Sequence, residues 1–297
     1  MKFQNLLLRL FPGMLLDMSS DENYYEGAKT GPFSVLISVY GKSDADFFSQ
    51  ALESIWTNQT LKPAQICIVK DGPLTIDLDN TIESWRKRYP SVITCVVIKE
   101  NVGLGSALNI GLTSCRYPII ARMDADDVSL PNRFFVQYRY LLEHPEVDVV
   151  GSQVQERDDG LQKVLAVRQV PLEHSNIVKF AKLRSPFNHP SVMYRKESVM
   201  AVGGYPHLFP EDYPLWIKML QAGANFANVN SILLIMRSEG AYRFRRGMTF
   251  FIREINVIFF LKKIGFLTWF ELIKSIALRF IYRLTPPYIK IFIKSKC

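Results

Sequence analysis

Two hydrophobic patterns alternate along the first half of this chain. Short apolar runs rich in β-branched residues predict strands, and each is followed by a longer segment with helical spacing. The predicted strands are Phe33–Tyr40, Gln65–Asp71, Val92–Ile98 and Tyr117–Met123, and the predicted helices are Ala45–Asn58, Ile76–Tyr89, Gly103–Thr113 and Pro131–Leu142. Strands that are apolar throughout and separated by helices pair in parallel, with both faces of the sheet covered. The pattern therefore predicts an α/β fold with a mostly parallel central sheet.

Each of these strands ends in polar, acidic or glycine residues. The ends are Ser38–Tyr40, Asp71–Gly72, Asn101–Gly103 and Asp124–Asp127. Because ligands bind at the carboxyl ends of the strands in parallel α/β sheets, we expect these four ends to line one cleft.

The second half of the chain has a more mixed pattern. It predicts a strand at Val147–Val154, a helix near Glu173–Leu183 and a turn at Gly203–Tyr205. Glu211-Asp212-Tyr213-Pro214 then opens a helix that reaches about Gly223.

The stretch IIARMDADDV places three carboxylates directly after a buried strand. Hard divalent cations such as Mg²⁺ and Mn²⁺ prefer oxygen ligands, and Mg²⁺ is usually held by one or two carboxylates plus substrate phosphates. The alternative is that Asp127 or Ser129 caps the helix that Pro131 starts. Capping needs one acid, whereas mutual repulsion makes three unfavourable without a cation. We therefore expect Asp124 and Asp126 to bind a divalent metal ion.

The stretch LFPEDYPLWIKML places Asp212 two residues before Pro214, near a predicted helix N-terminus. The helix dipole favours the ionised carboxylate there, and an ionised carboxylate at a cleft edge suits a general base for a hydroxyl nucleophile. Simple helix capping explains the position equally well. Only the fit of Asp212 with the metal motif favours the functional interpretation.

The net charge of +8 is concentrated in the tail. From residue 241 onward there are twelve Lys or Arg and two acids, a net charge of +10, which leaves −2 for the first 240 residues. Apolar Trp269, Leu272, Ile273, Ile276, Ala277, Phe280, Ile281 and Leu284 recur at helical spacing, and Phe251, Ile255, Ile258 and Phe259 repeat the pattern upstream. Such helices suit an anionic membrane surface or pack on the main domain. Aromatic residues that lie with the aliphatic ones argue against nucleic acid.

No stretch reaches the roughly 18 uncharged apolar residues that a spanning helix needs. The four cysteines show no metal-binding spacing, and Cys67 and Cys95 lie in apolar runs. We expect reduced core cysteines in a cytoplasmic protein, and we interpret the N-terminus as an amphipathic lead-in.

Taken in order, several motifs resemble those of the bacterial family 2 glycosyltransferases, inverting enzymes that build surface polysaccharides. They are VLISVYGK, IVKDGP, ENVGLGSALNIGL, ARMDADDVSLPNRF, VVGS, HPSVMYRK, GGY and EDYPLW, and the resemblance covers roughly Phe33 to Asn228. The resemblance implies a Rossmann-like A-type glycosyltransferase fold. We accordingly divide the chain into a lead-in (1–30), a catalytic domain (31–240) and a basic amphipathic membrane-associating helical tail (241–297).

The resemblance also implies roles for single residues. Ser38, Tyr40, Asp71 and Asn101 are similar to nucleotide-binding positions, and Asp124 and Asp126 are similar to the DxD pair that holds Mn²⁺ or Mg²⁺ on the diphosphate. Asp212 resembles the catalytic base, supported by Glu211. Candidate acceptor or diphosphate contacts are His189, Gly204, Trp216 and Arg243, the last within an arginine cluster with Arg237, Arg245 and Arg246. Many relatives carry Arg-Asn where this chain has Leu108-Asn109, so an arginine contact with the diphosphate is not expected there.

The implied reaction moves a hexose, with galactose favoured, from a UDP-sugar to a saccharide on a polyprenyl diphosphate at the cytoplasmic face of the bacterial inner membrane. Two alternatives remain open. A haloacid-dehalogenase-like phosphatase would use Asp124 and Asp126 in the motif DxDxV, and a non-catalytic membrane-bound scaffold would only bind the sugar nucleotide.

Overall fold

The computed structural model describes residues 30–238 and 248–284. Its strands are β1 (Thr30–Tyr40), β2 (Lys62–Asp71), β3 (Ile93–Ile98), β4 (Ile119–Asp124), β5 (Val128–Ser129), β6 (Val149–Arg157), β7 (Val164–Arg168), β8 (Met193–Arg195) and β9 (Phe226–Arg237). Its helices are α2 (Ala45–Ile55), α3 (Ile76–Arg88), α4 (Leu104–Ser114), α5 (Arg133–Glu143), α6 (His174–Ala181), the 3₁₀ turn η2 (His189–Ser191), α7 (Lys196–Ala201), α8 (Asp212–Gln221), α10 (Met248–Lys263) and α11 (Trp269–Leu284).

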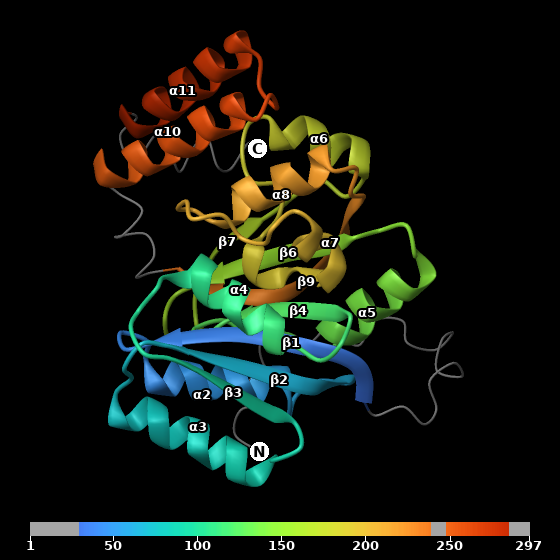
Figure 1. Cartoon of the computed structure of the whole chain (residues 1–297), viewed down its shortest axis with the longest axis vertical. Helices are drawn as coiled ribbons and strands as arrows, with labels where there is room; N and C mark the ends of the chain where they lie inside the picture. The colour runs from blue at the N-terminus through green and yellow to red at the C-terminus, as the bar shows by residue number, and fades with distance from the viewer. Residues whose placement is uncertain (1–29, 239–247, 285–297) are drawn as a thin grey trace.

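The described strands form one nine-stranded sheet in the order β3-β2-β1-β4-β8-β6-β9-β5, with β7 paired to β6 (Figure 1). The half of the sheet from β3 to β4 is parallel, as predicted, and the ends of its strands and helices lie within about three residues of the predicted ones. The other half is mixed, because β8 runs antiparallel to β4 and β6 while β6 and β9 run parallel.

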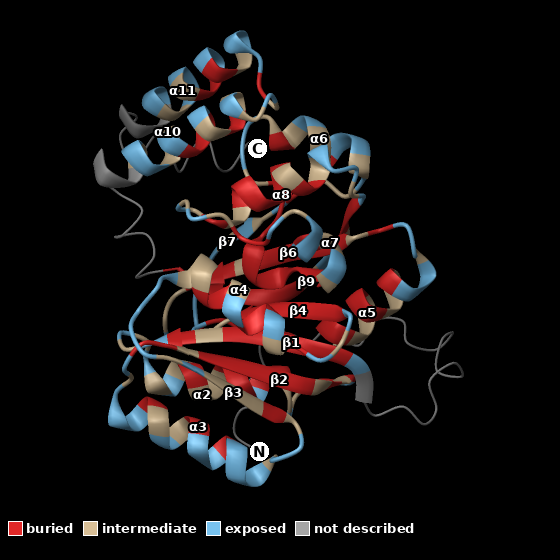
Figure 2. Cartoon of the chain, in the orientation of Figure 1, coloured by how far each residue is buried: buried red, intermediate tan, exposed pale blue. Residues whose placement is uncertain are grey.

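The sheet separates two hydrophobic cores. Successive residues of β1 point to opposite faces, so Val35 and Ile37 pack toward α2, α3 and α5, while Leu36 packs toward α4, α7 and α8. Figure 2 shows the central strands as a buried layer between helices whose outer faces are exposed. The two cores hold the strands rigidly, so the strand ends form a fixed platform for a site.

Beyond the sheet, α10 and α11 lie side by side at one end of the molecule, next to α8 (Figure 1). Val257, Ile258 and Leu261 of α10 and Leu272 of α11 share a buried cluster with Tyr213 and Ile217 of α8. The tail therefore packs on the main domain through one face. Within the described ranges, no helix is both long and apolar enough to cross a bilayer.

Substitution of Gly111 in α4 tests how closely this helix packs on the sheet. A methyl group there would lie 2.5 Å from side-chain carbons of both Leu36 and Val69. We expect Gly111→Ala to lower the free energy of unfolding by about 1–3 kcal/mol in urea titrations. Exposed Gly160, where the same methyl would meet only an Asp158 oxygen at 4.0 Å, provides the control. Gly160→Ala should stay within about 0.5 kcal/mol, and equal stability of the two variants would contradict the packing described.

Candidate active site

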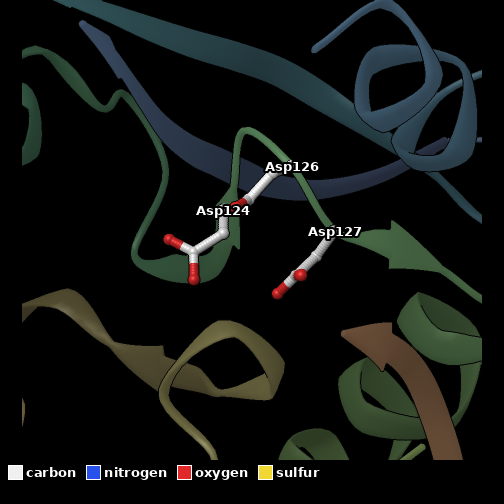
Figure 3. A group of neighbouring side chains, drawn as sticks. All are labelled: Asp124, Asp126 and Asp127. Carbon is white, nitrogen blue, oxygen red and sulfur yellow. The ribbon is translucent and has the colours of Figure 1, made fainter. Parts of the chain in front are cut away.

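The acidic turn lies where β4 ends at the centre of the sheet edge. Asp124 is the last residue of β4 and neighbours Ser38 of β1 in the parallel ladder. One carboxylate oxygen from each of Asp124, Asp126 and Asp127 lies within 4.8 Å of the others. Figure 3 shows the three side chains on this turn, with the Asp124 and Asp127 carboxylates pointing to the same side. This spacing suits a single divalent cation.

The charges of this turn are only partly balanced by the protein. Buried Arg122 donates to Asp124, with Nη2 2.5 Å from Oδ1. Desolvation by neighbouring protein atoms, reinforced by the Asp124 charge, raises the pKa of Asp126 to about 6 although this residue is exposed, and burial raises the pKa of Asp127 well above its usual range. Asp127 Oδ2 is buried and has no hydrogen-bond partner among the described residues. An orphaned carboxylate oxygen beside two other acids is the environment that a bound Mn²⁺ or Mg²⁺ would relieve.

Asp127 does not cap a helix. Helix α5 begins after Asn132, without a side-chain cap, and Asp127 Oδ1 instead accepts the backbone N–H of Arg237 at 3.1 Å. The capping alternative raised by the sequence is therefore wrong for Asp127. Ser129 does not cap this helix either, since its hydroxyl contacts Gln59.

Arg237, at the end of β9, is hydrogen-bonded to the acidic turn. Its guanidinium donates to the backbone carbonyls of Asp126 and Asp159 and to Gln50 Oε1, and it lies 4.2 Å from the centre of the Phe47 ring. The sequence grouped Arg237 with Arg243, Arg245 and Arg246 as diphosphate or membrane contacts. Arg237 is instead buried and engaged by the protein, and the other three lie outside the described residues.

The predicted nucleotide-binding residues gather along the neighbouring strand ends. Tyr40 and Asp71 are paired across the β1–β2 ladder, and the Tyr40 ring is 45% exposed. Asp71 accepts hydrogen bonds from Asn101 Nδ2 at 3.1 Å and from the Val102 backbone at 2.7 Å. Together with half-buried Ser38, these side chains lie on one edge of the sheet, as expected.

Glu211 and Asp212 approach this edge from α8. Asp212 is the first residue of that helix, as predicted, and its Oδ2 accepts a hydrogen bond from Ser185 Oγ at 3.0 Å. Burial, with the Asp212 charge adding to it, raises the pKa of Glu211 to about 7, while burial raises the pKa of Asp212 against the opposing effect of Ser185. The charge of Arg122 favours the ionised form of both groups. The acidic turn and the Glu211-Asp212 pair thus share one buried cation.

His189 and Trp216 are buried next to the Glu211-Asp212 pair. His189 Nε2 lies 3.1 Å from the Tyr205 hydroxyl, and Nδ1 lies 3.6 Å from Glu211. Burial lowers the pKa of His189 well below its usual range, so the ring is neutral at pH 7 and forms no ion pair with Glu211. Trp216 is fully buried and packs edge-on against the His189 and Phe187 rings. The candidate acceptor or diphosphate contact at Trp216 is therefore not accessible in this structure.

Asn109 has a positioning role that the sequence did not reveal. Its amide donates to the Tyr205 carbonyl and accepts the Tyr205 N–H, both at 2.8 Å. Gly204, with φ +70°, lies so close that a methyl group would be 2.3 Å from Asn109 Oδ1. Gly204 is thus a buried backbone position that fixes the segment leading to Glu211. The other candidate contact, Arg243, lies outside the described residues.

The sequence profile of glycosyl transferase family 2 matches residues 34–203, more than half of the chain. The chain belongs to this family. The match decides against the phosphatase alternative and confirms the resemblance found in the motifs.

Two curated bacterial relatives match over most of their length. The UDP-Gal:alpha-D-GlcNAc-diphosphoundecaprenol beta-1,3-galactosyltransferase of Escherichia coli is 36% identical over 269 residues, which cover 90% of this chain and 96% of the relative. The amylovoran biosynthesis glycosyltransferase AmsE of Erwinia amylovora is 37% identical over 271 residues, covering 89% and 98%. The name of the first relative gives UDP-Gal as donor and a GlcNAc-diphosphoundecaprenol as acceptor, and the name of the second places it in amylovoran biosynthesis.

Solved structures confirm the A-type glycosyltransferase fold. A mannosyltransferase from Pyrobaculum calidifontis, in complex with GDP-Man and Mn²⁺, superposes with a TM-score of 0.57 at 18% identity, over 76% of this chain and 62% of that one. S. aureus TarS in complex with UDP-GlcNAc gives a TM-score of 0.58 at 15% identity, over 77% and 66%. At these identities the likeness establishes the fold alone.

The raised carboxyl pKa values predict how pH and metal act on stability. The pKa of Asp126 in the folded protein, about 6, lies above its pKa in the unfolded chain. Protonated Asp126 therefore stabilises the folded, metal-free protein at low pH, and this stabilisation is lost as the pH rises toward 6. A divalent cation binds the ionised carboxylates, so Mn²⁺ should raise the melting temperature more at pH 8 than at pH 5. Thermal unfolding with and without Mn²⁺ at both pH values measures this difference.

Asp126→Asn should abolish most of the Mn²⁺-induced shift, whereas Asp77→Asn, at an exposed acid on α3, should retain it. A shift that is equal at both pH values, or unaffected by Asp126→Asn, would contradict the metal-binding assignment.

Proposed function

We propose that this protein is an inverting hexosyltransferase that moves galactose from UDP-galactose to a saccharide carried on a polyprenyl diphosphate. The observation that carries the proposal is the acidic turn together with the Glu211-Asp212 pair: Asp124 contacts buried Arg122, and the charge of Arg122 favours the ionised forms of Glu211 and Asp212. The E. coli relative, which uses UDP-Gal and a lipid diphosphate acceptor, supports the donor and acceptor classes.

Asp212 is the proposed general base. It takes the proton of the acceptor hydroxyl, whose oxygen forms a bond to the anomeric carbon on the face opposite the nucleotide. The bond from that carbon to the diphosphate oxygen breaks, and UDP leaves, so an α-linked donor gives a β-glycoside. Ser185 orients the base, and Glu211, with a pKa near 7, adds less negative charge beside it than a fully ionised acid would.

A divalent cation completes the donor site. Asp124 and Asp126 would hold Mn²⁺ or Mg²⁺, with Asp127 as a further ligand, and the bound ion would stabilise negative charge on the leaving diphosphate. Ser38, Tyr40, Asp71 and Asn101 are the proposed nucleotide contacts. TarS, which has the same fold, has been solved in complex with UDP-GlcNAc and with UDP, and this supports a uridine nucleotide as the ligand class.

A lipid-linked acceptor places the reaction at a membrane. We propose that the protein works peripherally at the cytoplasmic face of the inner membrane, as part of surface polysaccharide synthesis. This location agrees with the diphosphoundecaprenol-linked acceptor of the E. coli relative and with the amylovoran biosynthesis of the Erwinia relative.

Asp212→Asn tests the assignment of the base. The amide cannot accept the proton, so turnover should fall by about 10²–10⁴-fold, while the dissociation constant of UDP-galactose should stay within about threefold because the base does not hold the donor. Transfer from a panel of UDP-hexoses to a GlcNAc-diphosphate-lipid acceptor measures turnover, and calorimetry with Mn²⁺ measures donor binding.

Asp77→Asn serves as the matched control and should be fully active. Normal turnover by Asp212→Asn would remove the base assignment. Mn²⁺-dependent UDP binding by the unmodified protein, with no transfer from any donor in the panel, would support the non-catalytic scaffold instead.

A further inference from the structure

Helix α11 exposes a row of large apolar side chains, which we call the docking face. It consists of Trp269, Phe270, Ile273 and Phe280, which are 68%, 76%, 63% and 52% exposed. At about 100° per residue, these four positions lie on one stripe of the helix. We propose that this face lies on the surface of a bilayer that contains anionic lipids. The inference rests on the proposed lipid-linked acceptor and names the surface that would meet its membrane.

The docking face is distinct from the face that holds α11 to the rest of the protein. Leu272 and Ser275 are buried, and Leu272 belongs to the cluster shared with α8 and α10. The sequence placed Trp269, Leu272, Ile273 and Phe280 on a single apolar face. The structure divides them, because packing takes up only the side that includes Leu272. The remaining aromatic side stays in solvent, where apolar groups are unfavourable.

Its chemistry matches the interfacial zone of a bilayer. Tryptophan and phenylalanine are enriched where a helix lies parallel to a membrane, with the rings at the level of the headgroups. Lys274 is exposed four residues after Phe270, at the border of the stripe, and Lys262 lies 4.9 Å from the centre of the Trp269 ring. Lysines with long stems can reach anionic headgroups while the rings enter the apolar layer.

Charge favours a lipid surface over a second copy of the chain. The described residues 248–284 contain six Lys or Arg and two acids, a net charge of +4, so two copies meeting through α10 and α11 would repel each other. Glu271, one of the two acids there, is bound to Lys182 at 2.6 Å on the inner side and so does not oppose an anionic surface. An anionic membrane attracts the same charges.

The inner side of α11 is connected to the proposed base. Besides the Glu271–Lys182 pair, Ser275 Oγ donates to the Lys182 carbonyl and Arg279 Nη2 donates to the Leu183 carbonyl, at 3.3 and 2.8 Å. Two residues later, Ser185 donates to Asp212. A helix fixed on the membrane would therefore hold the base at a set position relative to the lipid surface from which the acceptor projects.

Vesicle binding of the full-length protein tests the docking face. The protein should sediment with vesicles of phosphatidylethanolamine and phosphatidylglycerol at about 3:1, should bind pure phosphatidylcholine vesicles far less, and should be released by salt. Phe270→Gln/Ile273→Gln should weaken binding at least about tenfold. The control Ile76→Gln/Val97→Gln changes two exposed apolar residues on α3 and β3 and should bind like the unmodified protein.

A second variant, Lys274→Glu, should weaken binding to the anionic vesicles only. Unchanged vesicle binding by Phe270→Gln/Ile273→Gln, with an unchanged melting temperature, would overturn the proposal. So would a stable dimer in solution that this variant converts to a monomer, because the face would then be an interface between two copies.

The proposed function is measured separately, on a short water-soluble acceptor that needs no membrane. If the proposed function holds, the unmodified protein and Phe270→Gln/Ile273→Gln should transfer equally well to that acceptor, while the variant loses transfer to the acceptor embedded in vesicles. If the galactosyl transfer itself fails, both reactions should be absent in every variant while the unmodified protein still binds vesicles, so the two failures are distinguishable.

Discussion

Burial of Arg122 beneath a group of carboxylates is the constraint on which the site depends. A guanidinium that is 1% exposed has a high desolvation cost unless charged partners surround it. The Asp124 carboxylate contacts it directly, and Glu211 and Asp212 experience its charge from another element. Since Arg122 Nε and Nη1 are buried without a hydrogen-bond partner among the described residues, the charge of Arg122 favours the convergence of acids from two distant parts of the chain. That convergence creates a site with more negative charge than the protein alone neutralises.

The excess negative charge explains the rest of the geometry. Arg237 neutralises part of it but acts mainly by donating from its guanidinium to the Asp126 carbonyl and from its backbone N–H to Asp127 Oδ1, which leaves the other Asp127 oxygen unpaired within the described residues. The protein thus fixes the shape of the acidic turn without saturating its oxygens. A rigid turn with spare carboxylate oxygens is preorganised for a cation that arrives with a nucleotide diphosphate.

Local patterns in the sequence were sufficient for the parallel half of the sheet and for the acidic turn, because both depend on contiguous residues. Four strands of the other half, β5, β7, β8 and β9, were missed. β8 is only three residues long, and the polar Asn228 and Asn230 interrupt the apolar run of β9, although ILLIM within it is a strand signal. Asn109 and Arg237 could not be assigned, because their partners lie 96 and about 110 residues away in the chain. The burial of Trp216 was not predicted, because an aromatic residue in a helix can face either a ligand or the core with the same spacing.

The sequence presented membrane binding and packing as alternatives for the tail, yet an amphipathic helix has room for both. A helix of 16 residues makes more than four turns, and packing against α8 and the Ala181–Ser185 segment takes up one stripe of it. A purely structural tail would gain from polar residues on the opposite stripe, since exposed aromatics favour aggregation. A purely membrane-binding tail would not need three hydrogen-bonded contacts to the segment that positions Asp212. Both features occur on one helix, which links the lipid surface to the catalytic edge of the sheet.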